Sequence, residues 1–172
     1  MRASVISVDA PPERAAGVRA VLDRHDLATS MVMGDIPLAA NSRDATRALR
    51  DITPYLDLAE RLGSKLVRVM MHGSDDIPHA QRAADEALDR GITLAHQTHW
   101  GTLCETVHGT LETARGVGRE NFGITFEPAN LMACGEDYGA DAIARLAPHL
   151  VNVYFQNVQL DSAGTHIFKT WA

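Results

Sequence analysis

The hydrophobic and polar positions along the chain follow two alternating periods. Short β-prone runs recur, and longer segments with apolar residues three and four positions apart lie between them. The predicted strands are Ser4–Val8, Ala28–Met33, Lys65–Met71, Ile92–Gln97, Phe122–Glu127 and Leu150–Phe155. Strands joined by helical crossovers run parallel, and helices must cover the faces of the sheet that such strands form. The pattern therefore predicts an α/β fold of six parallel strand–helix units.

The predicted helices have defined starts and ends. Pro11 and Pro12 open the first helix, because proline fits the first helical turn. The segment Asp44–Leu62 has helical spacing and ends at Gly63, which suits a C-terminal cap, while Pro54 predicts a kink or break within it. Further helices are expected over His79–Arg90 and Cys104–Val117, each followed by a glycine.

Residue parity within the strands favours a closed barrel over an open sheet. Thr125 and Glu127 share one face of their strand, and Ile124 and Phe126 share the other. The same alternation separates Arg68 and His72, Gln97 and His99, and Asn152, Tyr154 and Gln156 from apolar neighbours. The inward polar row grows richer toward the carboxyl ends, where a barrel has its mouth. Phosphate-binding glycine motifs of open nucleotide-binding sheets are missing, so a TIM-barrel-like (β/α) domain is expected.

Composition narrows the classes of partner and compartment. The 172 residues, 45% of them hydrophobic, predict one domain over residues 1–172. A net charge of −6 offers no basic surface for nucleic acid. Apolar runs stay far below the ~20 residues that cross a bilayer, so no membrane partner is expected. Two cysteines, Cys104 and Cys134, fit a reducing compartment, and a cytoplasmic location follows as an expectation.

Three strand ends carry hydrogen-bonding side chains where strand gives way to loop, the place at which barrel enzymes assemble their sites. These segments are residues 96–101, 126–131 and 152–157. Their order and spacing resemble the xylose isomerase-like TIM barrel family of sugar phosphate isomerases and epimerases, most specifically over residues 118–156. The resemblance makes the six strands the second to seventh of eight. It thus implies a partial chain that lacks the first and last barrel strands.

The resemblance also implies a metal site. Gln97 falls where the family has a metal-binding Glu, Glu127 where it has an Asp, and Tyr154 where it has a His. The implied ligands of a divalent ion (Mn, Mg or Zn) are therefore Glu127, Gln97 and Tyr154. Of these three side chains only Glu127 is anionic, whereas hard cations prefer anionic oxygen or imidazole ligands. The ligand set thus departs from the family pattern.

Other residues near the predicted mouth are candidates for contact with substrate. Asn130 falls where the family has a substrate-contacting His, although it could instead hold the turn at Pro128. Trp100 could stack on a sugar ring or fill a loop against the barrel rim. His99 faces inward by parity, whereas His96 faces the helices. The candidate substrate-binding residues are His72, His99, Trp100, Asn130, Gln156 and Asn157.

Two functions of different classes remain open. The first, implied by the resemblance, is an isomerase or epimerase that moves a proton next to the carbonyl of a sugar, sugar phosphate or polyol-like compound, with Glu127 as catalytic residue and a metal assisting. The second is a non-catalytic sugar-binding or interaction subunit in which neutral amides have replaced metal ligands. A salt bridge to Arg68 is the structural alternative for Glu127. A homo-oligomer that covers two open sheet edges is also expected.

Overall fold

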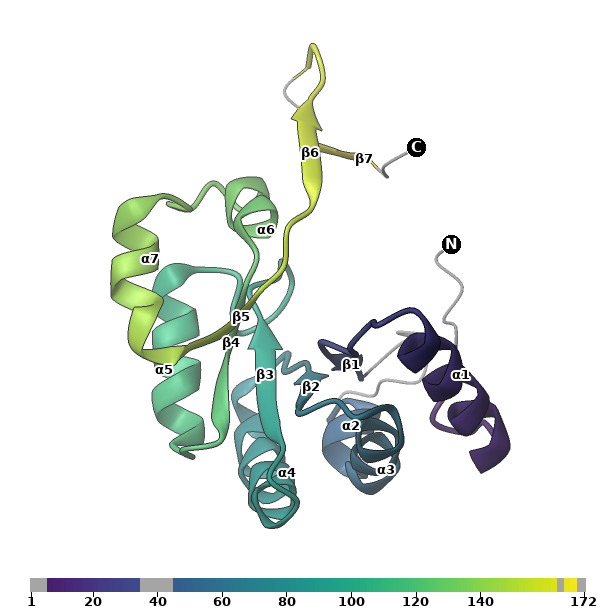
Figure 1. Cartoon of the computed structure of the whole chain (residues 1–172). Coiled ribbons are helices and arrows are strands. Elements are labelled where there is room, and N and C mark those ends of the chain that lie inside the picture. Colours follow the sequence, from purple (N-terminus) through teal and green to yellow (C-terminus); the bar gives the residue numbers. More distant parts are fainter. Residues whose placement is uncertain (1–5, 35–44, 164–165, 170–172) are drawn as a thin grey trace.

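The fold is built on a five-stranded parallel sheet, with strand order β1-β2-β3-β4-β5 (Figure 1). The computed structural model describes residues 6–34, 45–163 and 166–169. The strands are β1 (Val32–Met33), β2 (Leu66–Val69), β3 (Thr93–Gln97), β4 (Phe122–Phe126) and β5 (Leu150–Val153). Every neighbouring pair in this sheet is parallel, as predicted from the sequence, and the sheet with its helices forms a partial TIM-barrel-like α/β architecture.

Helices connect the strands, and the predicted proline and glycine signals lie at the ends of several of them, although the helix expected from Cys104 begins only at Val107. They are α1 (Pro12–Arg24), α2 (Arg47–Arg50), α3 (Thr53–Leu62), α4 (Ile77–Asp89), α5 (Val107–Val117), α6 (Pro128–Ala133) and α7 (Ala140–Leu146), with short 3-10 turns η2 (Ser74–Asp76) and η3 (Ala147–His149). The predicted break near Pro54 is confirmed, because Asp51 is extended and separates α2 from α3. Gly63 and Gly118 end α3 and α5 in the left-handed conformation. In the described part of the chain, no helix is long and apolar enough to cross a membrane.

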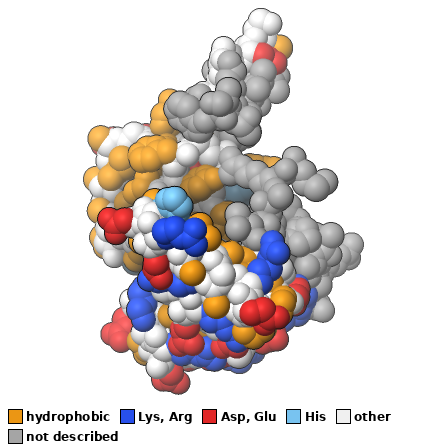
Figure 2. All heavy atoms as spheres, turned by 45° about the vertical axis from the view of Figure 1, so that its right-hand side comes forward, with side chains coloured by type: hydrophobic (Ala, Val, Ile, Leu, Met, Phe, Trp, Pro, Cys, Tyr) orange, Lys and Arg blue, Asp and Glu red, His pale blue; other side chains and the backbone are white. Residues whose placement is uncertain are grey.

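The core lies between the outer face of the sheet and the helices. Val67, Leu94 and Ile124, one from each of β2, β3 and β4, are fully buried in a single cluster with residues of α3 and α4. The predicted outward apolar row is therefore confirmed for these three strands. On the face shown in Figure 2, acidic and basic side chains are interspersed over the lower part of the molecule.

The first two predicted strands differ from the structure. Residues 6–8 form no strand, and the rest of Ser4–Val8 lies outside the described residues. Ser7 instead accepts a hydrogen bond from the backbone N–H of Asp9 at 3.2 Å, so a local turn competes with extension. Ala28–Met33 is a strand only at its last two residues, which pair with Val67 and Arg68 of β2.

The sixth predicted strand is interrupted by a β-bulge. Leu150 pairs with Ile124, but Asn152 pairs with Thr125, so Val151 is an extra residue in β5. A Cβ atom on Gly123 would overlap the Val151 side chain, which places Val151 over Gly123 on the inner face. The prediction that Val151 faces outward is therefore wrong, because a bulge shifts the alternation that parity assumes.

Beyond β5 the chain forms an antiparallel pair that the sequence pattern did not predict. Its strands are β6 (Asn157–Leu160) and β7 (His166–Lys169), and Asn157 pairs with Lys169. Figure 1 shows β6 leading away from the end of β5 and the parallel sheet. The expected run Leu150–Phe155 accordingly ends as a strand at Val153.

Candidate functional site

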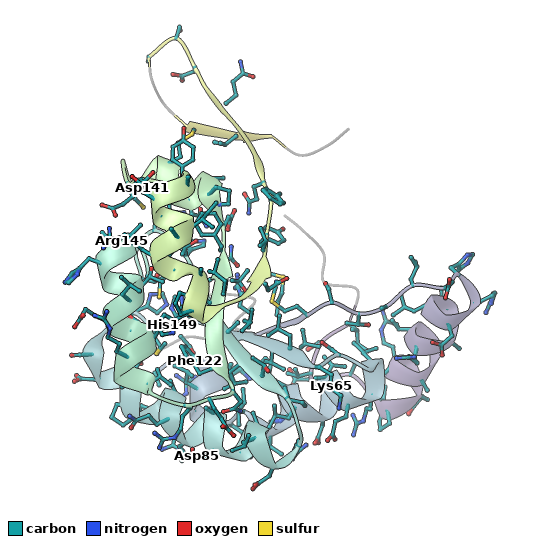
Figure 3. The ribbon with its side chains drawn as sticks, turned by 60° about the vertical axis from the view of Figure 1, so that its left-hand side comes forward. Lys65, Asp85, Phe122, Asp141, Arg145 and His149 are labelled. Carbon is teal, nitrogen blue, oxygen red and sulfur yellow. The ribbon has the colours of Figure 1, made fainter. Side chains whose placement is uncertain are left out.

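Four buried polar side chains meet at the carboxyl ends of β2, β3 and β4. Arg68 comes from β2, Gln97 is the last residue of β3, and Glu127 directly follows β4. Asn130 lies in the first turn of α6, which begins after Glu127. In Figure 3, Lys65, Phe122 and His149 mark the places where β2, β4 and β5 begin, which are at the other end of the sheet from these four side chains. The four side chains thus lie at the end of the sheet where a barrel has its mouth.

A chain of hydrogen bonds joins these four side chains. Arg68 Nη1 donates to Gln97 Oε1 at 2.7 Å, and Gln97 Nε2 donates to Glu127 Oε2. Asn130 Nδ2 donates to the same Glu127 oxygen at 2.6 Å. The exposed fractions are 6% for Arg68, 2% for Gln97 and Asn130, and 0% for Glu127. We name this set the Arg68–Asn130 network.

The orientation of the Gln97 amide follows from its two neighbours. A guanidinium can only donate hydrogen bonds, and an ionised carboxylate can only accept them. Gln97 therefore presents its carbonyl oxygen to Arg68 and its NH₂ group to Glu127, as the contacts show. Gln97 thus links Arg68, the structural partner suggested for Glu127 from the sequence, to the Glu127 carboxylate.

Thr98 ties the ends of β3 and β4 together and so holds the network in place. Its Oγ1 accepts from the backbone N–H of Glu127 at 2.8 Å and donates to the Glu127 carbonyl oxygen at 3.2 Å. Its own carbonyl oxygen accepts from Asn130 Nδ2 at 3.0 Å. Sequence reasoning missed Thr98, and the available signal was its position between Gln97 and His99 at a strand end.

Met31 and Val151 lie on the inner face of the sheet, further from the strand ends than the network. The Met31 sulfur accepts weak hydrogen bonds from Thr125 Oγ1 at 3.9 Å and from Asn152 Nδ2 at 3.7 Å. Val151 lies nearby over Gly123. Below the polar side chains, the interior is therefore partly filled by Met31 and Val151.

His96 lies on the opposite face of β3 and belongs to the core. Its Nε2 accepts from the backbone N–H of Met71 at 2.8 Å, so its Nδ1 donates to the Gln97 carbonyl oxygen at 2.7 Å. Burial lowers the pKa of His96 to about 4, which keeps the ring neutral. The predicted outward placement of His96 is confirmed.

His72, His99 and Trp100 lie at the rim of the site. His99 Nδ1 bonds to the Trp100 carbonyl oxygen at 2.8 Å, and the two rings stack with centroids 5.4 Å apart. His72 Nδ1 bonds to the Gly101 carbonyl oxygen at 3.0 Å. Partial burial lowers the pKa of His99, and Trp100 is 58% exposed. These contacts order the loop after β3, and a role in substrate binding stays a prediction for all three residues.

The remaining candidates, Tyr154, Gln156 and Asn157, follow the end of β5. The Tyr154 backbone N–H donates to the Phe126 carbonyl oxygen at 2.9 Å, which sets Tyr154 beside the end of β4. Gln156 is half-buried between β5 and β6. Asn157 begins β6, and its side chain lies outside the described residues. Substrate binding by Gln156 and Asn157 stays a prediction.

The donor set does not fit a divalent metal ion. Among the described residues there is no group of three or more His, Cys, Asp or Glu side chains that could hold one. The Arg68–Asn130 network offers one carboxylate, while the Gln97 carbonyl faces a guanidinium and its NH₂ faces Glu127. Hard cations need several oxygen ligands and are repelled by a fixed positive charge. We therefore assign no metal to Glu127, Gln97 and Tyr154.

Comparisons with known proteins agree with this architecture. The family model described as xylose isomerase-like TIM barrel matches residues 2–166. A xylose isomerase-like TIM barrel protein from Mycobacterium smegmatis, solved in complex with magnesium, has a TM-score of 0.72 at 17% identity over 94% of this chain and 62% of its own. No curated protein matches the sequence.

Two further solved structures are of sugar epimerases. A D-psicose 3-epimerase, solved in the presence of D-fructose, has a TM-score of 0.72 at 15% identity over 91% of this chain and 63% of its own. A D-allulose 3-epimerase from Methylomonas sp., solved in complex with D-allulose, has a TM-score of 0.67 at 16% identity over 84% of this chain and 58% of its own. This chain thus spans about six tenths of the length of these proteins, and at such identities the likeness establishes the fold.

Proposed function

Because the chain belongs to the xylose isomerase-like TIM barrel family, we propose that it acts as an isomerase or epimerase on a sugar, a sugar phosphate or a polyol-like carbonyl compound. The proposed reaction moves a proton at the carbon next to the carbonyl group. The observation that carries the proposal is the carboxylate of Glu127, fully buried at the carboxyl end of the sheet and held by two amides. A buried carboxylate is costly, so such a position indicates a task or a partner.

The contacts of Glu127 suit a group that receives a proton from carbon. Two amide N–H groups donate to its Oε2, which stabilises the ionised form that a base requires. Because both donors come from fixed positions, on β3 and α6, they also hold the carboxylate in one orientation. We propose Glu127 as the catalytic residue, with Gln97 and Asn130 orienting it, and assign no step to a metal ion.

Ketohexoses are the first substrates to test. The relatives described above include a D-psicose 3-epimerase in the presence of D-fructose and a D-allulose 3-epimerase in complex with D-allulose. A mouth with amide groups suits hydroxyl recognition, because an amide both donates and accepts hydrogen bonds. Trp100 at the rim offers an exposed ring for an apolar sugar face.

A second candidate function is sugar binding without catalysis. The observation in its favour is that Gln97 and Asn130 both direct their NH₂ groups to Glu127, so one oxygen of the carboxylate already accepts two hydrogen bonds. In that case Glu127 would organise the amides, and the amides would recognise the ligand. The two candidates differ in whether a bound sugar exchanges its carbon-bound proton with solvent.

The test is solvent deuterium exchange. We would incubate D-fructose and D-allulose with the protein in D₂O and follow the protons on the carbons beside the carbonyl by NMR. The isomerase proposal predicts exchange that falls at least about 100-fold in Glu127→Gln and is unchanged in Glu120→Gln, whose side chain is exposed. Binding without exchange would favour the second candidate. Neither binding nor exchange would contradict both.

A further inference from the structure

The buried carboxylate of Glu127 requires a positive charge nearby, and the chain contains one. An ionised group taken out of water is stable only when it is paired and hydrogen-bonded. Arg68 is itself buried, and one side chain, Gln97, links its guanidinium to the carboxylate. A second Arg68 nitrogen, Nη2, lies 3.5 Å from the Gly34 carbonyl oxygen, which helps to hold the guanidinium in place.

Arg68 also controls which groups can approach Glu127. To coordinate a cation together with Glu127, Gln97 would have to turn its carbonyl oxygen toward the carboxylate. That rotation would place the Gln97 NH₂ group against the guanidinium, and two donors would then face each other. The contact between Arg68 and the Gln97 oxygen therefore holds an N–H group beside Glu127, where a metal would need an oxygen.

We propose that Arg68 is the resident cation of this site and balances the charge of Glu127 in place of a divalent ion, with Gln97 as the positioning residue between them. The site is then independent of metal and suits hydroxyl-bearing ligands. Only the choice of ligand rests on the proposed function. The charge balance itself is tested without turnover, so failure of one proposal is distinguishable from failure of the other.

The first experiment measures the melting temperature with and without MnCl₂. The wild-type protein should show no change. The double variant Arg68→Met with Gln97→Glu replaces the guanidinium and the amide by an apolar side chain and a second carboxylate. Its melting temperature should be lower than that of the wild type. Saturating MnCl₂ should raise it by at least about 4 °C, and EDTA should reverse that rise.

The control is Gln97→Glu alone, which keeps Arg68 beside the new carboxylate and should not respond to MnCl₂. A rise in the wild-type melting temperature that disappears in Glu127→Gln would overturn the proposal. So would a folded double variant that does not respond to the ion, because Arg68 and Gln97 would then not be what excludes it.

A double-mutant cycle covers the case in which the double variant fails to fold. Arg68→Met should lower the melting temperature, and adding Glu127→Gln should recover part of that loss, because the charge that needs balance is gone. Additive losses would show that Arg68 and Glu127 are not coupled and would overturn the proposal. Loss of the free Mn²⁺ signal in electron paramagnetic resonance on adding wild-type protein, but not on adding Glu127→Gln, would overturn it as well.

Discussion

Gln97 joins a buried cation to a buried carboxylate, so one neutral side chain forms hydrogen bonds to both charges. Its carbonyl oxygen accepts from Arg68 and its NH₂ group donates to Glu127. Hydrogen bonds to charged groups contribute more to stability than neutral ones, because the charge cannot be satisfied by water once it is buried. The network should therefore be sensitive to the loss of this one amide.

We predict that Gln97→Ala lowers the free energy of unfolding by about 2 to 3 kcal/mol, since Arg68 and Glu127 each lose a hydrogen bond inside the protein. Urea denaturation of both proteins measures the change. The matched control is Gln81→Ala on α4, whose amide bonds to the Gly116 carbonyl oxygen near the surface and whose loss should cost less than about 0.5 kcal/mol. Equal losses in the free energy of unfolding for the two variants would contradict the claim that Gln97 stabilises two buried charges.

His96 should make stability depend on pH. Its folded pKa of about 4 lies below its ordinary value of 6.5, so between these values the unfolded chain binds a proton that the folded ring excludes. The stabilisation is complete above pH 6.5 and is lost as the pH falls toward 4, a loss of about 3 kcal/mol. The free energy of unfolding of wild type should therefore fall more steeply over this range than that of His96→Gln. If the free energies of unfolding of wild type and His96→Gln changed with pH in parallel, the claim that the buried His96 ring stays neutral would be contradicted.

The sequence predicted part of the site, and the physical reasons are specific. Parity placed Gln97 and Glu127 on the inner face, because alternation along a strand is a backbone property. It also predicted that Arg68 shares this face. It could not predict that Gln97 lies between Arg68 and Glu127 or that Thr98 ties the strands, because such contacts depend on the register of neighbouring strands and on loop geometry.

At the scale of elements, the helix ends marked by proline or glycine were the most predictable features. Within a helix proline fits only the first turn, and glycine readily adopts positive φ, so single residues determined these boundaries. The bulge in β5 was not predictable in the same way, because it depends on Gly123 leaving room for the Val151 side chain on a neighbouring strand. Strand parity therefore failed for Val151 in β5, after holding in β2, β3 and β4.

Two glycines near the end of α5 provide a matched test of this reasoning. Gly116 lies within the helix, where an added Cβ would make ordinary contact with Ile77, so Gly116→Ala should raise the free energy of unfolding by about 0.5 to 1 kcal/mol. Gly118 ends the helix at φ 56°, so Gly118→Ala should lower it by about 1 kcal/mol. Thermal or urea unfolding measures both changes, and the same sign for both would contradict the assigned helix end.

At the scale of the whole molecule, the alternation of two periods in the sequence predicted the parallel α/β architecture. One period is that of a helix and the other is that of a strand. They did not predict the pair β6 and β7, which depends on a turn that brings Asn157 opposite Lys169. The first and last strands of the parallel sheet, β1 and β5, are its two edges. On β5 and just beyond it, Val153 and Phe155 are 47% and 78% exposed.

Self-association that covers these sheet edges stays a prediction. Exposed strand edges bind other strands, and an added charge on an edge opposes such pairing. Sedimentation velocity over a range of concentrations should therefore show association of the wild-type chain that Val153→Lys weakens. A wild-type monomer at every concentration would contradict the prediction.

The most direct test of the central claim, that the Arg68–Asn130 network is a sugar-binding site, is to observe its amides by NMR. The side-chain NH₂ signals of Gln97 and Asn130 can be assigned by their absence in Gln97→Ala and Asn130→Ala, and then followed while D-fructose or D-allulose is added. The account predicts that both signals shift in a saturable way, while the NH₂ signal of Gln81 on α4 stays fixed. Sugar binding that moves neither network amide would contradict it.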